Sequence, residues 1–266
     1  MRKIMNRTMS LLLVAIMAFS LAACGASGDN SGAAPAESKA AGETAGAQTG
    51  SSGEKIVNVG VTDTLGSLNP LQLNGGEINK YATALMFLPL MELDADLNFQ
   101  GMVADSITTE DNKNFVVHID DAAKWSDGTP ITAEVAYTAL RLASPVINNT
   151  AMMYYVFEGV GDDGFVEAGA DSVAGINVID EKTVQFTTKE AMSLTTFQNS
   201  YARYLLTLPK HVIEKYSEEE LATADWFNKP DVISGPFFVT DYDVDHYISY
   251  KANPDYWRSA TKLDKL

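Results

Sequence analysis

The sequence changes character at residue 55, and this change limits which part of the chain can fold. Residues 25–54 are almost entirely small or polar and contain no aromatic or large aliphatic side chain. Such a segment cannot bury enough apolar surface to offset the entropy lost on folding, so we expect it to be disordered. The apolar run at residues 56–61 is expected to form a buried strand, and ordered structure is expected to continue to residue 266. The folded part therefore has room for one large core or for two lobes.

Residues 1–23 have the composition of a signal peptide. Basic side chains come first, an apolar run follows at residues 11–21, and small residues precede the expected cleavage site. The apolar run is shorter than the ~18 residues that a membrane-spanning helix needs, so a permanent transmembrane helix is the weaker interpretation. We therefore expect the chain to be exported.

Residues 21–24 read Leu-Ala-Ala-Cys, which resembles the lipobox after which bacterial lipoproteins are cleaved and acylated. Cys24 is the only cysteine, which excludes an intramolecular disulfide and a cysteine zinc cluster. Several acyl chains on one residue give stable anchoring. We predict a lipidated Cys24 followed by a flexible tether over residues 24–54, about 30 Å from end to end. The folded part would then lie at the outer face of the bacterial cytoplasmic membrane.

The acidic composition excludes nucleic acid as a partner. The chain has 19 basic and 35 acidic residues, and removal of the signal peptide changes the formal net charge from −16 to −19. Binding to a phosphate backbone requires a surplus of clustered Lys and Arg side chains. We interpret the acidity as a source of solubility for an exported domain.

Three segments carry helical patterns. Apolar residues at helical spacing predict a helix over residues 77–87. Thr132 is expected to cap a second helix that continues to residue 143, with Glu134 favourably placed in its first turn. Ser217 and Glu220 form a capping box, which predicts a third helix that reaches residue 227.

Strand patterns lie between and after these helices. Apolar and polar residues alternate over residues 115–119, and residues 176–187 have the pattern of a hairpin around an acidic turn. Residues 237–239 and 247–251 are predicted to be two further strands. The chain is therefore expected to have a mixed α/β fold.

No catalytic constellation stands out in the sequence. His118, His211 and His246 form no His-Glu-x-x-His pair, and we interpret each as a packed or surface imidazole. The Gly-x-Ser-x-Gly pattern of a nucleophile elbow is not present either. We therefore predict no catalytic residue and no bound metal.

A glycine-rich stretch resembles a nucleotide-binding pattern only in outline. Gly159, Gly161 and Gly164 match Gly-x-Gly-x-x-Gly, but Asp162 and Asp163 lie where a pyrophosphate would sit and would repel it. The stretch also lacks the earlier oxygen ligands of a calcium-binding loop. We predict a surface turn here and no cofactor.

Four stretches, taken in order, resemble the family 5 extracellular solute-binding proteins, which include the oligopeptide-, dipeptide- and nickel-binding components of ABC importers. The most specific stretch ends in Trp-Ser-Asp-Gly-Thr-Pro-Ile-Thr-Ala-Glu at residues 125–134. Val135 follows where the family usually has another acidic residue, so the helix start is expected to be shifted by one position. The stretches cover residues 67–70; 101–106, 115–119 and 123–134; 208–211; and 234–237, 253–257 and 263–266.

The resemblance implies a type II periplasmic-binding-protein-like α/β fold, in which two lobes close over a ligand. Residues 55–90 and 191–266 would together form the first lobe, and residues 91–190 would be a small α/β domain inserted into it. Members of the family continue well beyond the last stretch, so the first lobe would be cut short and the second lobe would be missing here. We expect a fragment of this kind to bind peptides more weakly than a complete relative.

The resemblance also implies a function without covalent chemistry. Such a protein would capture a peptide or other small solute outside the cell and deliver it to ABC permease subunits, as a monomer held to the membrane by its lipid. Nickel chelates and oligosaccharides are alternative solutes within this class. A surface-anchored hydrolase is an alternative from a different class, although it would need a nucleophile that the sequence does not offer.

The family places part of its cleft in the loop that follows residues 67–70. This carries a ligand-binding role over to Asn74, Gly75 and Gly76, whose adjacent glycines would leave the backbone accessible to a peptide. An ordinary turn is the alternative. Tyr154 and Tyr155 are further candidates, with a buried aromatic pair as the alternative interpretation.

Overall fold

The computed structural model describes residues 53–266 apart from residues 73–75, 150 and 244–245. Its largest sheet is antiparallel, with the strand order β3-β4-β6-β5. Cys24 and the predicted signal peptide and tether lie outside the described residues. The strands are β3 (Ala104–Thr108), β4 (Asn114–Ile119), β5 (Ile176–Val178) and β6 (Thr183–Thr187).

The predicted strand at residues 115–119 and the predicted hairpin are both confirmed. Phe115, Val117 and Ile119 alternate with partly exposed residues along β4 and are fully buried. Phe115 pairs with Phe186 of β6, and β6 pairs in turn with β5 across the acidic turn. An alternating sequence forms a strand here because one face of the sheet is covered.

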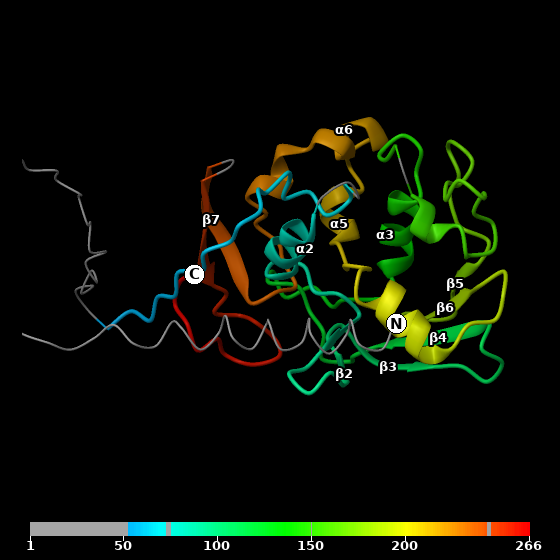
Figure 1. The fold of residues 1–266 in the computed structure, drawn as a ribbon, viewed down its shortest axis with the longest axis horizontal. Helices are drawn as coiled ribbons and strands as arrows, with labels where there is room; N and C mark the ends of the chain where they lie inside the picture. The colour runs from blue at the N-terminus through cyan, green and yellow to red at the C-terminus, as the bar shows by residue number, and fades with distance from the viewer. Residues whose placement is uncertain (1–52, 73–75, 150, 244–245) are drawn as a thin grey trace, which may run out of the picture. The chain divides into compact units, whose positions relative to one another are not determined.

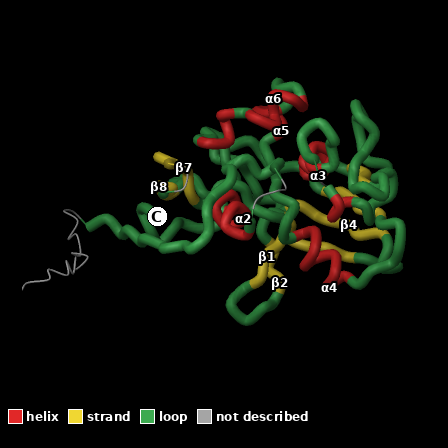
Figure 2. Tube along the Cα trace, turned by 45° about the horizontal axis from the view of Figure 1, so that its top comes forward, coloured by secondary structure: helices red, strands yellow, loops and turns green. Residues whose placement is uncertain are grey.

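Aromatic side chains form the cover on this face. Helix α4 (Leu194–Phe197) lies beside β4 (Figure 2) and continues into the π-helix η2 (Gln198–Ala202). The rings of Phe115 and Phe197 stack with their centroids 4.2 Å apart and a 5° angle between planes. Phe157 contacts Phe197 edge-on at 6.5 Å. Stacked and edge-on pairs of this kind add to the stabilisation that burial already gives.

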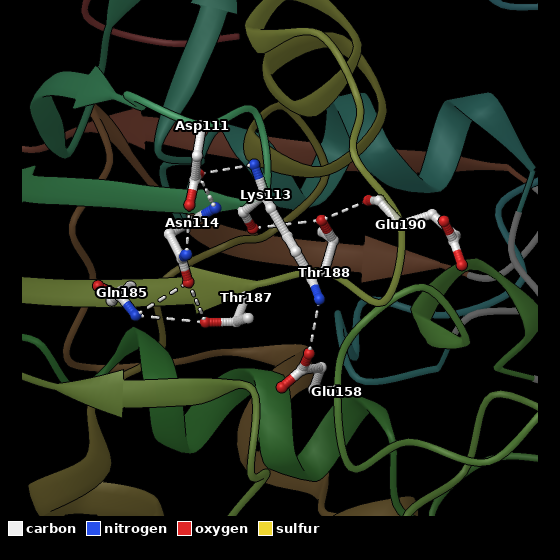
Figure 3. Close-up of polar contacts among 8 residues, drawn as sticks. All are labelled: Asp111, Lys113, Asn114, Glu158, Gln185, Thr187, Thr188 and Glu190. Atoms are coloured by element: carbon white, nitrogen blue, oxygen red, sulfur yellow. Dashed lines mark hydrogen bonds and ion pairs between the residues drawn. The ribbon is translucent and has the colours of Figure 1, made fainter.

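A polar network fastens one end of β4 to β6 (Figure 3). Asp111 accepts hydrogen bonds from the backbone N–H groups of Asn114 and Lys113 at 2.7 and 2.9 Å, and these bonds lower the pKa of Asp111 to about 2. The Asn114 Oδ1 atom accepts a bond of 2.8 Å from the Thr187 hydroxyl of β6. Lys113 Nζ lies 3.1 Å from a carboxylate oxygen of Glu158. The turn before β4 is therefore held both locally and across the sheet.

The helices are short. Helix α2 confirms the helix predicted in residues 77–87, although it ends at Ala84. Helix α3 lies next to β5 (Figure 1). Alongside α4 and η2, the helical elements are α2 (Glu77–Ala84), α3 (Val135–Leu142), η1 (Met152–Tyr154), α5 (Lys210–Ile213), α6 (Glu218–Thr223) and η3 (Asp225–Asn228).

The start of α3 differs from the prediction. Thr132 does not cap the helix, which begins at Val135 with Glu134 in the N-cap position and no side-chain cap bond. The residues before it are held in place because Ala133 N–H donates to the Glu181 carbonyl at 2.8 Å. Glu134 itself accepts a bond of 2.8 Å from the indole Nε1 of Trp125. Tertiary hydrogen bonds thus delay the helix beyond the point where the local pattern predicted it.

The capping box before α6 is confirmed. The Ser217 hydroxyl accepts from Glu220 N–H at 3.2 Å, and the Glu220 carboxylate accepts from Ser217 N–H at 2.8 Å. The helix ends at Thr223 rather than near residue 227, because Ala224 takes an extended conformation with ψ 118°. The 3-10 turn η3 then follows.

Two smaller antiparallel sheets complete the structure. Strands β1 (Met91–Leu93) and β2 (Phe99–Gly101) pair with each other, as do β7 (Phe237–Asp243) and β8 (Tyr247–Ala252). The last pair confirms the two strands predicted there, and both strands are longer than expected. Strand β8 also pairs with the last residue, because Tyr250 and Leu266 exchange backbone hydrogen bonds of 2.8 and 3.1 Å.

The prediction of a buried strand at residues 56–61 is wrong. The apolar side chains of this segment are 39–67% exposed, and its only bridge among the described residues joins Ile56 to Lys265. Within the described chain, the backbone of residues 58–61 makes no hydrogen bond to another backbone group. The β-type pattern is present, but nothing in the described part of the chain covers these side chains enough to bury them.

The described residues belong to one compact unit with a shared apolar core. The division into a first lobe, made of residues 55–90 and 191–266, and an inserted domain at residues 91–190 stays a prediction. Among the described residues, none of the helices has both the length and the apolar character needed to cross a bilayer.

Candidate functional site

A cavity of about 430 Å³ opens between α2, the turn before it and the chain around η2. More than half of its lining residues have polar, uncharged side chains. The lining residues come from four segments of the sequence: Asn69, Pro70 and Gln72; Gly76, Glu77, Asn79, Lys80 and Thr83; Met153; and Asn199, Ser200, Tyr204 and Leu206. A cavity of this size can hold a small organic solute.

Buried asparagines hold the floor of the cavity in place. Asn69 donates to the Leu221 carbonyl at 2.8 Å and accepts from Leu71 N–H at 3.0 Å. Asn79 of α2 donates to the Ser67 carbonyl at 2.7 Å and accepts from Gly66 N–H at 3.1 Å. Because both amides are used in this way, the turn at residues 67–70 is tied to α2 and to α6.

Lys80 is a nearly buried cation in the wall of the cavity. Its side chain is 10% exposed, and its Nζ atom makes no hydrogen bond to any described residue. The nearest carboxylate oxygen is Glu92 Oε2 at 3.4 Å, and the ring centroid of Tyr204 lies 4.3 Å away. The ammonium is therefore held by charge and by an aromatic face rather than by hydrogen bonds.

Glu92 is shared between two cations. Burial alone would raise the pKa of Glu92, but hydrogen bonds from Leu93 N–H and Arg203 and the charges of Lys80 and Arg203 hold it below its ordinary value. Arg203 also donates to Asn199 Oδ1 at 3.0 Å. The pair of Glu92 and Arg203 thus connects β1 to the η2 side of the cavity.

The structure brings only some of the predicted ligand-binding set to this cavity. Asn74 and Gly75 lie outside the described residues. Gly76 lines the cavity, and a Cβ atom there would come within 3.0 Å of Asp63 Oδ2.

The two tyrosines do not line the cavity. Tyr154 is 3% exposed and lies in the core beside Phe157, where burial raises the pKa of its hydroxyl. Tyr155 is 47% exposed. Tyr154 is therefore a buried aromatic residue, as the alternative interpretation had it. Tyr155 is not buried.

Nothing in the sequence singles out Lys80, Asn199 or Tyr204. Lys80 lies in α2 without any recognisable motif around it. Its partners, Glu92 and Tyr204, come from β1 and from the chain after η2. Only the tertiary fold brings these residues together, so no spacing in the sequence could reveal the site.

A second cavity, of about 650 Å³, adjoins the 125–134 stretch, and two of its lining side chains, Glu134 and His211, make structural contacts. Burial raises the pKa of Glu134, and hydrogen bonds from Trp125 Nε1 and Lys210 N–H offset only some of the rise. His211 Nε2 lies 3.0 Å from Asp127 Oδ2. The most specific family-like stretch therefore acts as scaffold, with Trp125 fully buried.

The other residues considered for chemistry are dispersed. His118 and His246 each lie beside one aspartate, Asp105 at 3.0 Å and Asp243 at 3.2 Å. No group of three or more His, Cys, Asp and Glu side chains in the described portion of the chain could hold a metal.

The glycine-rich stretch forms the predicted surface turn. Gly161 N–H donates to the Phe165 carbonyl at 2.7 Å. Gly159 has φ +82°, and a Cβ atom there would come within 2.6 Å of Ala174. These glycines therefore serve a tight backbone path.

The chain is similar to bacterial proteins named for binding oligopeptides or peptidoglycan. Periplasmic oligopeptide-binding protein OppA of Escherichia coli is 30% identical over 208 residues, which cover 73% of this chain and 35% of OppA. Peptidoglycan-binding protein YepA of Agrobacterium fabrum is 26% identical over 210 residues, which cover 76% of this chain and 31% of YepA. The chain thus spans about a third of the length of the curated relatives it matches.

Solved structures show the same fold. A periplasmic oligopeptide-binding protein of Borrelia burgdorferi matches with a TM-score of 0.65 and 23% identity, over 80% of this chain and 42% of that one. The murein tripeptide binding protein MppA of Escherichia coli matches with a TM-score of 0.64 and 21% identity, over 77% of this chain and 40% of that one. The α/β fold expected from the sequence is confirmed as periplasmic-binding-protein-like.

The family described as "Bacterial extracellular solute-binding proteins, family 5 Middle" matches residues 98–266. This match covers more than half of the chain and includes three of the four stretches that pointed to the family. The chain belongs to the family 5 bacterial extracellular solute-binding proteins.

Proposed function

We propose that this protein is the substrate-binding lipoprotein of an ABC importer, which captures peptides outside the cell and delivers them to a membrane permease. The observation that carries the proposal is the family match over residues 98–266. Similar proteins named for oligopeptide and murein tripeptide binding support a peptide as the solute. Capture and release require no bond to be made or broken in the solute.

The cavity beside α2 suits a ligand with many amide groups. Its wall includes Gln72, Asn199 and Ser200, whose side chains can donate and accept hydrogen bonds. Uncharged polar side chains of this kind can bind a peptide main chain without demanding one side-chain sequence, because bridging water adapts to different side chains. This supports a broad peptide specificity.

The anchor belongs to the same proposal. A lipid on Cys24 and the tether over residues 24–54 would keep the folded portion at the outer face of the membrane, close to the permease. Within the proposal, residues 55–90 and 191–266 form the first lobe, and residues 91–190 form the inserted domain.

Peptide binding is tested by NMR titration of the purified full chain with tetra-alanine. We expect saturable shifts of backbone amide signals around the cavity, at Asn79 and Ser200, and none at Val117 in the four-stranded sheet. A titration in which no signal near the cavity moves at millimolar peptide would contradict the proposed solute.

The anchor is tested in bacteria fed an alkyne analogue of palmitate. The wild-type chain is expected to take up the label and to fractionate with membranes, whereas Cys24→Ala should do neither. Equal labelling of both proteins would refute lipidation at Cys24.

A further inference from the structure

The positive charge of Lys80 is not fully neutralised by the described residues around it. A lysine ammonium has three donors, and none of those of Lys80 is used in a hydrogen bond to a described residue. A buried cation without hydrogen bonds is costly, since water no longer solvates it. The 3.4 Å contact to Glu92 offsets only some of this cost.

Glu92 is largely committed elsewhere. Its Oε1 atom accepts from Leu93 N–H at 2.9 Å and from Arg203, which leaves only Oε2 toward Lys80. Two cations therefore share one carboxylate. The cluster of Lys80, Glu92 and Arg203 has a surplus of one positive charge.

The Lys80 side chain lines the cavity described above, and its Nζ atom is buried in the cavity wall. Among the described residues that line this cavity, Lys80 is the only one with a cationic side chain. The acidic lining residue Glu77 is exposed, so water screens its charge. The Tyr204 ring covers one side of the ammonium at 4.3 Å and restricts where a further partner can approach.

We propose that Lys80 is an anion subsite that receives a carboxylate of the bound solute. A carboxylate carries the single negative charge that matches the surplus, and its oxygens accept charge-assisted hydrogen bonds. A phosphate, with nearly two negative charges, would exceed that surplus. The inference rests on the proposed function, because it names the chemical group that a captured peptide would present at this position.

Two groups of a peptide could supply the carboxylate, the C-terminus or an acidic side chain. Three probes separate them: tetra-alanine as the free acid, tetra-alanine amide, and Ala-Glu-Ala-Ala amide. Glutarate serves as a small carboxylate probe that does not depend on peptide recognition. The full chain is labelled with ¹³C and ¹⁵N so that the Lys80 side-chain signals report each titration directly.

We expect glutarate and at least one carboxylate-bearing peptide to shift the Lys80 Cε and Nζ signals. Lys80→Met should weaken their binding by about ten- to a hundredfold, the range of one hydrogen bond to a charged group. Lys80→Arg should restore most of the binding. Tetra-alanine amide should bind Lys80→Met and wild type alike, which a merely structural role of Lys80 would not predict.

Lys113→Met is the matched control, because Lys113 pairs with Glu158 at 3.1 Å outside the cavity. It should leave every titration unchanged. If the peptides bind wild type and Lys80→Met equally, the inference fails and the proposed function stands. If glutarate shifts Lys80 but no peptide binds, the anion subsite stands and the peptide function fails. If no probe shifts Lys80, the inference is refuted.

Discussion

Gly235 illustrates how single residues of the family-like stretches act through packing. Its N–H donates to the Met86 carbonyl at 2.7 Å, and a Cβ atom would come within 2.3 Å of the Leu85 carbonyl oxygen. Gly235→Ala is therefore expected to lower the free energy of unfolding by about 1–3 kcal/mol, because backbone must move to make room. Urea denaturation measures the change.

Gly60→Ala is the control for this substitution, because nothing lies within 4 Å of a Cβ atom there. It should change the free energy of unfolding by no more than ~0.5 kcal/mol. Equal effects of the two substitutions would show that close packing at Gly235 is not the cause.

Asp111 makes stability depend on pH. Its pKa is about 2 in the folded chain against an ordinary 3.8, so the folded state binds fewer protons than the unfolded state between these values. The stabilisation is complete above about pH 4 and is lost as pH falls toward 2. Asp111→Asn should thus destabilise the chain at about pH 6 and much less at about pH 2, as followed by urea denaturation.

The exposed Asp171 provides the comparison for that experiment. Asp171→Asn should change the free energy of unfolding at about pH 6 by no more than ~0.5 kcal/mol. A pH-independent effect of Asp111→Asn would mean that its backbone hydrogen bonds do not depress the pKa.

At the scale of elements, local capping is tested at α6. Ser217→Ala removes the acceptor for Glu220 N–H and should lower the free energy of unfolding by ~1 kcal/mol. Ser259→Ala, at an exposed serine, should have little effect. Thermal denaturation of both variants distinguishes a cap from a general loss of hydroxyl groups, and equal melting temperatures would contradict the capping role.

Elements were predictable where local pattern and tertiary environment agree. Alternation predicted β4 correctly because Phe115 and Val117 meet a covering layer of aromatic rings. The same reasoning failed at Val59, whose pattern is right but which nothing in the described part of the chain buries. Thr132 was expected to cap α3, but the hydrogen bond from Ala133 to Glu181 holds that segment outside the helix.

The candidate site was less accessible to sequence reasoning than the fold. Gly76 was proposed because it follows a recognisable stretch; it lines the candidate cavity, and its ligand-binding role stays a prediction. Lys80, Glu92 and Tyr204 meet only through the arrangement of α2, β1 and the chain after η2. The spacing of these residues in the sequence does not predict that they lie together, since none of them belongs to a recognisable motif in its own segment.

Segments far apart in the sequence are joined at one edge of the β7–β8 sheet. Lys55 N–H donates to Asp264 at 2.7 Å, Val57 N–H to the Lys265 carbonyl at 3.3 Å, and Tyr250 N–H to the Leu266 carbonyl at 2.8 Å. Deletion of residues 263–266 should therefore speed hydrogen exchange at Val57 and Tyr250, because both amides lose their acceptors.

The amide of Val117, in the four-stranded sheet, is the internal reference for that deletion. Its exchange rate should stay unchanged if the loss is local. Faster exchange at all three amides would instead indicate that the last residues support the entire fold.

The exposed segment at residues 58–61 has a consequence for how copies of the chain behave together. Val59 and Val61 present a bare, β-prone edge, and the backbone groups beside them have no backbone partner in the described chain. Such an edge is a template for another extended strand. Concentrated solutions should slowly acquire intermolecular β-structure, visible in the infrared amide I band, and Val59→Lys should delay it. The exposed stretch would thus make self-association depend on how concentrated the chain is.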